Sequence, residues 1–339
     1  MVVTIKDLAK KLHVSPATVS LALNDNPAIN QETARKVKEA AQSMGYIRNH
    51  YARGLARRRS GSIALVLPDV ENQYFASVIH HVANECKAAG YDMTIAITHD
   101  EAEEEWHILR RLCQEHTEAI LLVPTTHPPK SSAYLHWLQE CKVPLIFVTA
   151  RYAEVDAPLA MCDLKRGMRT MTEYILSLGL TDTALLTGEE GVETLDMRRE
   201  GYMEVLQEHD LAGKFIHLET VAYQQAYDQV SAMCREELPE ALLCINDMVA
   251  LGAINALHDM HLRVPEDISV SGFDDSIFSR ISGVPVSTVR QDVAQISRQA
   301  VALALVDAAY KEPGTPLQVD VRGRRVDAQV VKTPFYRRG

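Results

Sequence analysis

The chain has 339 residues, of which 47% are hydrophobic, and this length favours two or three packed domains over one. Such a composition excludes a disordered or fibrous chain. No apolar run reaches the ~18 residues of a membrane helix, and the polar N-terminus has no apolar signal-peptide core. We therefore expect a cytoplasmic protein without a membrane partner. Six scattered cysteines without a C-x-x-C pair are typical of buried, reduced thiols.

Charge is distributed unevenly along the chain, whose net charge is −10. The head (residues 1–60) contains 11 basic and 4 acidic side chains, whereas the body (residues 61–339) contains 24 basic and 41 acidic ones. A head of +7 on a body of −17 predicts that the head binds a polyanion such as nucleic acid. Counting alone leaves a chance asymmetry open.

The first 45 residues have the pattern of three short helices. Ser15 and Pro16 are typical of an N-cap and a first helical residue, so a second helix restarts there after a tight turn. The expected caps and helix ends, in chain order, are Thr4, His13, Ser15, Asn30 and Gly45. Two short helices followed by a longer one are typical of the helix-turn-helix. Spacing alone leaves an ordinary three-helix bundle open, and the basic charge favours DNA binding.

Strand and helix signals alternate through the body. Apolar runs predict parallel strands at 62–67, 93–98, 119–123, 145–148, 183–186, 241–245, 268–273 and 286–289. Helical patterns fall at 74–89, 101–115, 132–140, 164–178, 197–209, 224–236, 248–259 and 293–310, and short strands at 317–321 and 329–331 complete the chain. The alternation predicts an α/β fold of two doubly wound halves behind an all-α head.

Sequence motifs of common α/β enzymes are missing. No G-x-G-x-x-G follows the first strand, which removes the dinucleotide fingerprint, and no G-x-S-x-G marks a hydrolase nucleophile. No histidine or cysteine spacing suits a metal site. We therefore expect no catalytic residues, no cofactor and no metal.

Several segments of the head carry a specific family resemblance. Residues 4–9, 14–20 and 45–49, together with Asn24, resemble the head of the lactose/galactose repressor (LacI/GalR) family. The resemblance implies that residues 15–23 form the recognition helix in the major groove. It implies DNA contacts from Thr4, Ser15, Pro16, Ala17, Thr18, Ser20, Leu21, Asn24, Asn30, Thr33, Tyr46, Asn49, Ala52 and Leu55.

The expected base-facing side chains are unusually apolar. By family position, Pro16, Ala17 and Leu21 face the base edges, where Ala and Leu contact only apolar groups such as the thymine methyl. We therefore expect few hydrogen bonds to bases at these positions. The short polar side chains Ser15, Thr18, Ser20, Asn24, Asn30 and Thr33 suit phosphates, which fix register without reading sequence.

Residues 49–60 form a basic segment that includes Leu55. One interpretation is a solvated linker, because about ten residues are too few for a stable isolated helix. The resemblance implies instead a hinge helix that folds on DNA, pairs with its twin and wedges Leu55 between minor-groove base steps. A leucine within a basic linker favours the wedge.

The body resembles the periplasmic sugar-binding fold that this family uses as a sensor, over residues 69–75, 198–202, 246–253, 264–275 and 287–291. The resemblance implies a ligand between two lobes at the carboxyl ends of strands. The implied effector-binding residues are Tyr74, Phe75, Arg198, Asn246 and Asp274. A carboxylate accepts sugar hydroxyls and a guanidinium donates in a fork, so the set suits a polyhydroxylated ligand. Each residue alone could also serve as a cap, a surface ion pair or core.

Two positions depart from the family pattern. Thr149 and Leu164 stand where many members carry Asp and Asn, which leaves the effector identity open. Arg151 either favours an acidic or phosphorylated ligand or pairs with Asp156.

Together these features predict a DNA-binding transcriptional regulator, a repressor, controlled by a small-molecule effector. The expected domains are 1–48 (helix-turn-helix), 49–60 (hinge) and 61–339 (effector binding and dimerisation), with lobes of about 61–161 plus 291–320 and 162–290 plus 321–339. We expect a homodimer on a near-palindromic operator. A cytosolic sugar-binding protein and an α/β enzyme with a DNA-binding head remain alternatives.

Overall fold

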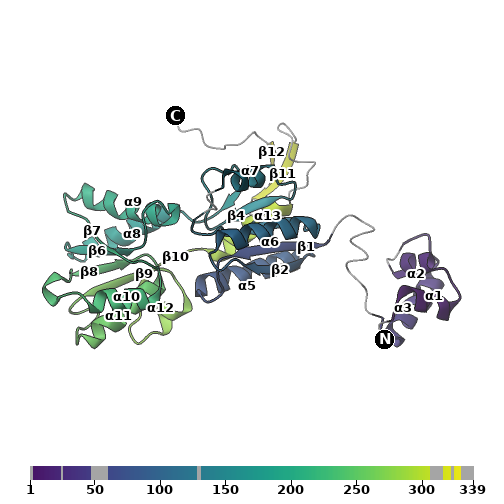
Figure 1. Ribbon diagram of the computed structural model, residues 1–339, viewed down its shortest axis with the longest axis horizontal. Helices are drawn as coiled ribbons and strands as arrows, with labels where there is room; N and C mark the ends of the chain where they lie inside the picture. Colours follow the sequence, from purple (N-terminus) through teal and green to yellow (C-terminus); the bar gives the residue numbers. More distant parts are fainter. Residues whose placement is uncertain are drawn as a thin grey trace. The chain divides into compact units, whose positions relative to one another are not determined.

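The computed structural model describes residues 3–23, 26–46, 60–127, 131–305, 316–321 and 324–329. Backbone contacts divide the chain into two units, Met1–Ser60 and Gly61–Gly339, which are the head and the body (Figure 1). Throughout these described ranges, every helix is too short or too polar to span a bilayer.

The head contains α1 (Ile5–Leu12), α2 (Pro16–Leu23) and α3 (Gln31–Ser43). Leu8, Val19 and Val37 are fully or almost fully buried at their common core. The expected caps are confirmed: Thr4 and Asp7 form a reciprocal capping box, and the Asn30 side chain accepts the Thr33 N–H at 2.7 Å. His13 ends α1 with a left-handed backbone, and Gly45 follows α3 with a positive φ. Local cap chemistry therefore places the helix boundaries of the head.

The body contains two parallel sheets of the same topology. The first has the strand order β2-β1-β3-β4-β5 and the second the order β7-β6-β8-β9-β10, so both follow the doubly wound order 2-1-3-4-5. The strands of the first sheet are β1 (Ser62–Leu67), β2 (Asp92–Ile97), β3 (Ala119–Leu122), β4 (Leu145–Val148) and β5 (Leu159–Ala160). Those of the second are β6 (Thr183–Thr187), β7 (Lys214–His217), β8 (Ala241–Cys244), β9 (Ser269–Asp274) and β10 (Ser287–Arg290).

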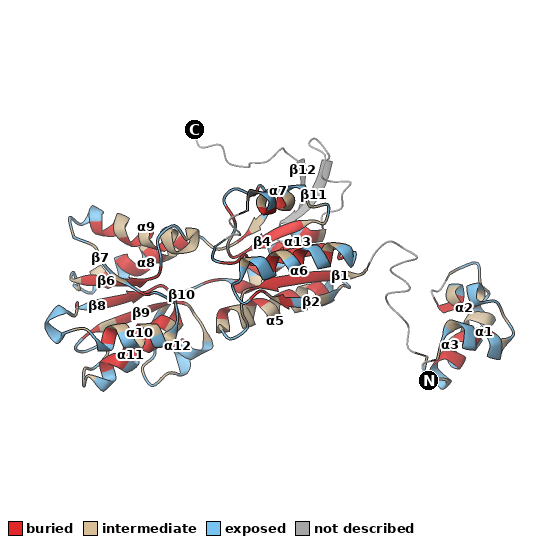
Figure 2. Ribbon diagram, viewed as in Figure 1, coloured by how far each residue is buried: buried red, intermediate tan, exposed pale blue. Residues whose placement is uncertain are grey.

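Helices cover both faces of the first sheet, and Figure 2 shows its strands β1 and β4 buried between them. On β1, Ile63 and Leu65 pack with α5 (Gln73–Ala88) and α13 (Val293–Leu305), whereas Ala64 and Val66 pack with α6 (Ala102–Gln114) and α7 (Ser132–Glu140). Because successive side chains enter different helix layers, the strand is a continuous apolar run. We call this sheet with these four helices the first lobe.

The second lobe is the second sheet with the helices that lie between β5 and β10. These are α8 (Leu164–Ser177), α9 (Glu193–Glu208), α10 (Tyr223–Ser231), α11 (Asp247–Asp259), α12 (Ile277–Ile281) and a 3₁₀ turn (Arg235–Glu237). Although α13 follows β10, it contacts α5, β3, β4 and β5. The chain thus enters the second lobe after β5 and returns to the first lobe after β10.

The structure also differs from the sequence predictions. Strands β5 and β7 and helix α12 were not predicted, because β5 has two residues, β7 is mostly exposed and α12 is a single short turn of helix. Strands β11 (Pro316–Val321) and β12 (Arg324–Gln329) pair antiparallel in one ribbon. The expected lobe boundary between residues 320 and 321 would cut this ribbon, and the structure does not support it. Residues 306–310 and 330–331 of the expected elements lie outside the described residues.

Candidate effector site and DNA-binding face

The outward face of α2 carries the side chains expected to meet bases. Pro16, Ala17 and Leu21 are exposed, whereas Val19 and Leu23 are buried against α1 and α3. The helical spacing that buries one stripe of α2 therefore presents Ala17 and Leu21, four residues apart, on the opposite face.

Several of the expected DNA-contacting residues lie at helix N-termini. The Thr4 hydroxyl donates to Asp7 Oδ2 at 2.6 Å, and Ser15 Oγ accepts the Thr18 N–H at 3.0 Å. Of the rest, Ser20, Thr33 and Tyr46 are partly exposed, and Asn30 is exposed. Asn24, Asn49, Ala52 and Leu55, with residues 49–59 of the expected hinge, lie outside the described residues.

A cavity of about 770 Å³ opens between the two lobes of the body, and all five predicted effector-binding residues line it. They are Tyr74 and Phe75 from the first turn of α5, Arg198 from α9, Asn246 at the start of α11 and Asp274 at the end of β9. The carboxyl ends of β1, β3, β4, β6, β8 and β9 converge on this cleft, as expected for ligand sites of doubly wound sheets.

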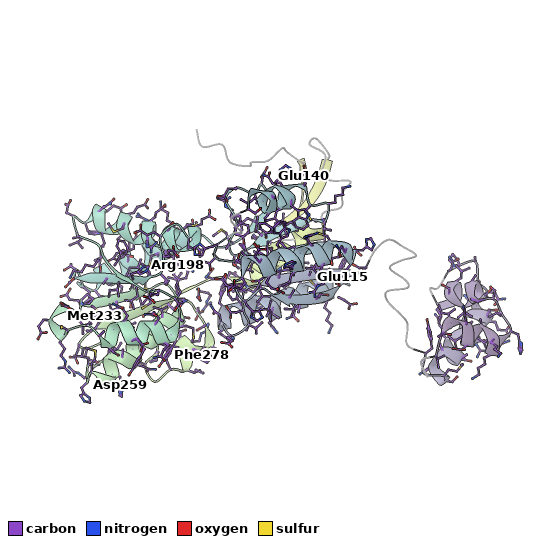
Figure 3. All side chains as sticks on the ribbon, viewed as in Figure 1. Glu115, Glu140, Arg198, Met233, Asp259 and Phe278 are labelled. Atoms are coloured by element: carbon purple, nitrogen blue, oxygen red, sulfur yellow. The ribbon has the colours of Figure 1, made fainter. Side chains whose placement is uncertain are left out.

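Arg198 and Asp274 form a buried pair on the cleft wall of the second lobe, where Figure 3 labels Arg198. Arg198 Nη2 lies 3.8 Å from Asp274 Oδ1, and their side chains are 9% and 10% exposed. The guanidinium lies 4.4 Å from the Phe273 ring centroid, and its Nη1 donates to the Thr194 carbonyl at 2.9 Å. Its Nε has no hydrogen-bond partner within the described part of the chain. The pair therefore retains donor and acceptor capacity.

Burial changes the protonation equilibria of this pair. Desolvation raises the pKa of Asp274 to about 7, although the Arg198 charge and a hydrogen bond from Gln291 act in the opposite direction. Desolvation likewise lowers the pKa of Arg198, against the attraction of Asp274. The Asp274 carboxyl thus titrates near neutral pH.

Gln291 connects this pair to the first lobe at the point where the chain returns from β10. Its Nε2 donates to Asp274 Oδ1 at 2.7 Å, and its Oε1 accepts the Tyr74 hydroxyl at 3.1 Å. Tyr74 meets Phe75 edge to face, with ring centroids 5.7 Å apart. Sequence reasoning did not select Gln291, although it belongs to the matching segment 287–291.

Two local features position the second-lobe residues. A Cβ at Gly201 would clash with the Lys165 carbonyl oxygen of α8, so glycine allows α9, which carries Arg198, to pack closely against α8. Asn246 is the N-cap of α11, and its Oδ1 accepts the Val249 N–H at 2.8 Å. The oxygen of Asn246 is thus already used as a cap, which leaves its NH₂ group as the donor toward the cleft.

Comparison with known proteins identifies both units. Residues 4–49 match the model of bacterial regulatory proteins of the lacI family, and residues 172–326 match a periplasmic binding protein-like domain. A probable transcriptional repressor ExuR of Bacillus subtilis is 31% identical, covering 87% of this chain and 88% of its own. A ribose operon repressor of Halalkalibacterium halodurans is 27% identical over 97% of each chain. The chain belongs to the LacI family.

The fold agrees with that assignment. The crystal structure of a lac repressor dimer bound to operator and the anti-inducer ONPF has a TM-score of 0.80 to this chain. It is 23% identical, covering 90% of this chain and 92% of its own. The head with its helix-turn-helix and the two-lobed body are therefore both LacI-family features.

An ion pair and a histidine–carboxylate contact cross the cleft of this LacI-family protein. Arg151, which follows β4, donates to Glu193 at the start of α9, with Nη2–Oε1 2.9 Å and Nε–Oε1 3.1 Å. His127 Nε2 lies 3.2 Å from Glu189 Oε2. The alternative that Arg151 pairs with Asp156 is therefore wrong, because the nearer carboxylate comes from the other lobe.

The two departures from the family pattern both line the cleft. Thr149 has a φ of 66° and Leu164 is buried at the start of α8. Asp274, with a φ of 113°, is a second positive-φ residue at a strand end. Non-glycine residues rarely adopt such backbone conformations, which concentrate at functional sites. These outliers on both lobes favour the cleft as the site of binding.

Proposed function

We propose that this LacI-family protein is a transcriptional repressor whose operator affinity is set by a small polyhydroxylated effector, a sugar, bound between the lobes. The observation that carries the proposal is the Arg198–Asp274 pair, which is buried in the cleft and retains an unpartnered Nε. A buried polar group without a partner costs free energy, so a ligand that supplies the partner gains affinity there.

The ligand contacts follow from the chemistry of the cleft. Asp274, as carboxylate, accepts ligand hydroxyls, and Arg198 donates to ligand oxygens. Tyr74 and Phe75 offer aromatic surface to a sugar ring, and the NH₂ group of Asn246 is a further donor because its oxygen caps α11. Thr149 and Leu164 make the cleft less polar than the family pattern, which favours a ligand with an apolar or deoxy edge on that side.

On DNA, the proposal places α2 in the major groove with Ala17 and Leu21 against bases. The N-termini of the three head helices and Ser15, Thr18 and Asn30 contact phosphates. For residues outside the described ranges, Leu55 is the proposed minor-groove wedge and Asn24, Asn49 and Ala52 are proposed backbone contacts. The protein acts in the cytoplasm, with the DNA that it regulates.

A two-fold homodimer provides the symmetry for a near-palindromic operator. Exposed apolar side chains support it: Ile277, Phe278 and Ile281 on α12, of which Figure 3 labels Phe278, and Ile95 on the edge strand β2. Ile281 is 67% exposed, which is high for an apolar helix residue of a monomer. Burial of these two surfaces against a second copy removes them from water.

The effector acts by favouring one arrangement of the lobes. A ligand shifts such an equilibrium only by its difference in affinity for the two states, so ~100-fold regulation needs about 3 kcal/mol of preference. Gln291, which bonds to both Tyr74 and Asp274, links the ligand-contacting carboxylate to the first lobe.

The test is a thermal-shift screen of full-length protein against pentoses, hexoses and their acidic derivatives, because a bound ligand raises the melting temperature. The operator is first found by selecting DNA that binds the same protein in vitro. A hit should then change the affinity of the protein for that DNA. A body fragment of residues 61–339 should bind the hit but not the DNA. Operator binding by that fragment, or hits that leave DNA affinity unchanged, would contradict the proposal.

A further inference from the structure

Helices α6 and α7, on one face of the first sheet, are tied together at the cleft by a buried carboxylate. Glu105 in the first turn of α6 is fully buried, and its Oε1 accepts hydrogen bonds from the hydroxyls of Tyr134 on α7 and Tyr152. Its Oε2 accepts the Thr125 N–H at 2.8 Å. Thr125 and Tyr152 line the cleft, so this end of the helix pair supports the cleft wall.

The opposite ends of the same helices meet through two thiols. Cys113 in the last turn of α6 and Cys141 at the C-cap of α7 place their Sγ atoms 3.4 Å apart. Each lies about 11 Å further along its helix than the Glu105–Tyr134 contact, at ~1.5 Å per residue. The helix pair is therefore in contact at both ends, through a carboxylate beside the cleft and through two thiols away from it.

This thiol pair differs from the other cysteines of the chain. Cys113 and Cys141 are partly exposed, so small oxidants reach them, and their sulfurs lie in contact. Cys162 is also partly exposed and Cys234 is exposed, whereas Cys86 and Cys244 are buried. The two thiols share one hydrogen bond, and this contact lowers the pKa of Cys141 and raises that of Cys113. One sulfur of the pair is thus favoured as the thiolate nucleophile. The expectation that the cysteines are buried holds for only two of the six.

We propose that Cys113 and Cys141 form an oxidation site, at which a hydroperoxide converts the two thiols into an intramolecular disulfide. The Cys141 thiolate attacks one oxygen of hydrogen peroxide, the O–O bond breaks, and a sulfenic acid forms while the leaving hydroxide takes up a proton. The Cys113 sulfur then attacks the sulfenic sulfur, and the hydroxyl leaves with the Cys113 proton as water. Two thiols lose two electrons and two protons, and one peroxide becomes two waters.

The disulfide cross-links positions 28 residues apart without using any residue that lines the cleft. It links the ends of α6 and α7 that lie away from the cleft. Beside the cleft, Glu105 of α6 accepts hydrogen bonds from Thr125 and Tyr152. Because a cross-link restricts the unfolded chain, the oxidised protein should melt roughly 5 °C above the reduced protein. The cross-link therefore joins two helices that support the cleft wall without altering any residue that lines the cleft.

The experiment uses reduced full-length protein treated with hydrogen peroxide. The number of thiols counted after unfolding should fall from six to four. Peptide mapping without reductant should show the Cys113 peptide joined to the Cys141 peptide, and dithiothreitol should restore both thiols. Cys113→Ser and Cys141→Ser should each lose the cross-link and the gain in melting temperature, whereas the control Cys234→Ser should keep both.

The map of the wild-type protein decides the question even if a variant fails to fold. Maps in which Cys113 and Cys141 stay reduced while Cys234 reacts would overturn the proposal. So would separate, irreversible oxidation of the two sulfurs, or linkage only between chains.

Discussion

The head and the body use charged side chains in opposite ways. Every buried side chain in the described part of the head is apolar, and its basic residues lie at the surface, where Arg35 and Lys36 pair only with carboxylates of their own helix. The body is acidic overall, yet at its cleft it buries Arg198 against Asp274. Solvated charges suit a long polyanion whose counterions they release, whereas desolvated charges suit a small ligand that must be recognised by hydrogen bonds. The comparison predicts two binding reactions with different physical signatures.

Salt should separate the two reactions most strongly. Raising the salt concentration from 50 to 200 mM should weaken operator binding by about 1000-fold or more, since each neutralised phosphate releases counterions. Effector affinity should change by less than about 2-fold, because the Arg198–Asp274 pair is shielded from bulk ions. Fluorescence anisotropy with operator DNA and calorimetry with the effector measure the two. Equal salt dependence would remove the distinction between head and body.

Loss of the buried carboxylate should act on the effector alone. Asp274→Ala should cost roughly 2–4 kcal/mol of effector affinity, about 30- to 1000-fold, because ligand hydroxyls lose an acceptor and the buried Arg198 charge loses its partner. Operator affinity without effector should stay within about 3-fold of wild type, since the head is unchanged. The matched control is Asp275→Ala, whose carboxylate bonds to Arg280 and Arg290 and does not line the cleft. Wild-type effector affinity in Asp274→Ala would remove Asp274 from the site.

Effector affinity should depend on pH through the same residue. The pKa of Asp274 is raised to about 7, and the carboxylate accepts ligand hydroxyls at both oxygens, more strongly than the neutral acid, one oxygen of which carries the proton. Affinity is therefore complete above pH 7 and falls as pH drops through it, by about 10-fold between pH 8 and pH 6. Asp274→Asn should bind effector more weakly, and its affinity should not fall in this way as the pH drops. His99 and His127 still line the cleft of that variant. An unchanged slope in that variant would show that Asp274 does not cause the pH dependence.

The exposed Arg151–Glu193 ion pair across the cleft should contribute least to effector affinity. Arg151 and Glu193 are 45% and 31% exposed, and exposed pairs contribute about 0.2–1 kcal/mol. Arg151→Gln should therefore weaken effector binding by about 2- to 5-fold. A double-mutant cycle with Glu193→Gln measures the coupling between the two side chains. Additive effects of the two substitutions would show that the pair does not help to close the cleft.

The sequence predicted the features that have a local pattern in the chain and missed the features that have none. Buried strands β1 and β4 were predicted to the residue because each is a continuous apolar run, and the caps Thr4 and Asn30 act within three residues. The exposed edge strand β7 has no such run and was missed. Gln291 was missed because its role joins Tyr74, 217 residues away, to Asp274. The five cleft residues came from the family resemblance, since no local pattern brings them together.

The most direct test of the account combines two measurements on the full-length protein. One is its operator affinity as effector is added, and the other is its effector affinity with and without operator. The account predicts that the effector changes operator affinity by some factor, and that operator changes effector affinity by the same factor, as linkage requires. In Asp274→Ala the response should appear only at effector concentrations raised by the loss of affinity. An effector that saturates the cleft of the wild-type protein and leaves operator affinity unchanged would contradict the account.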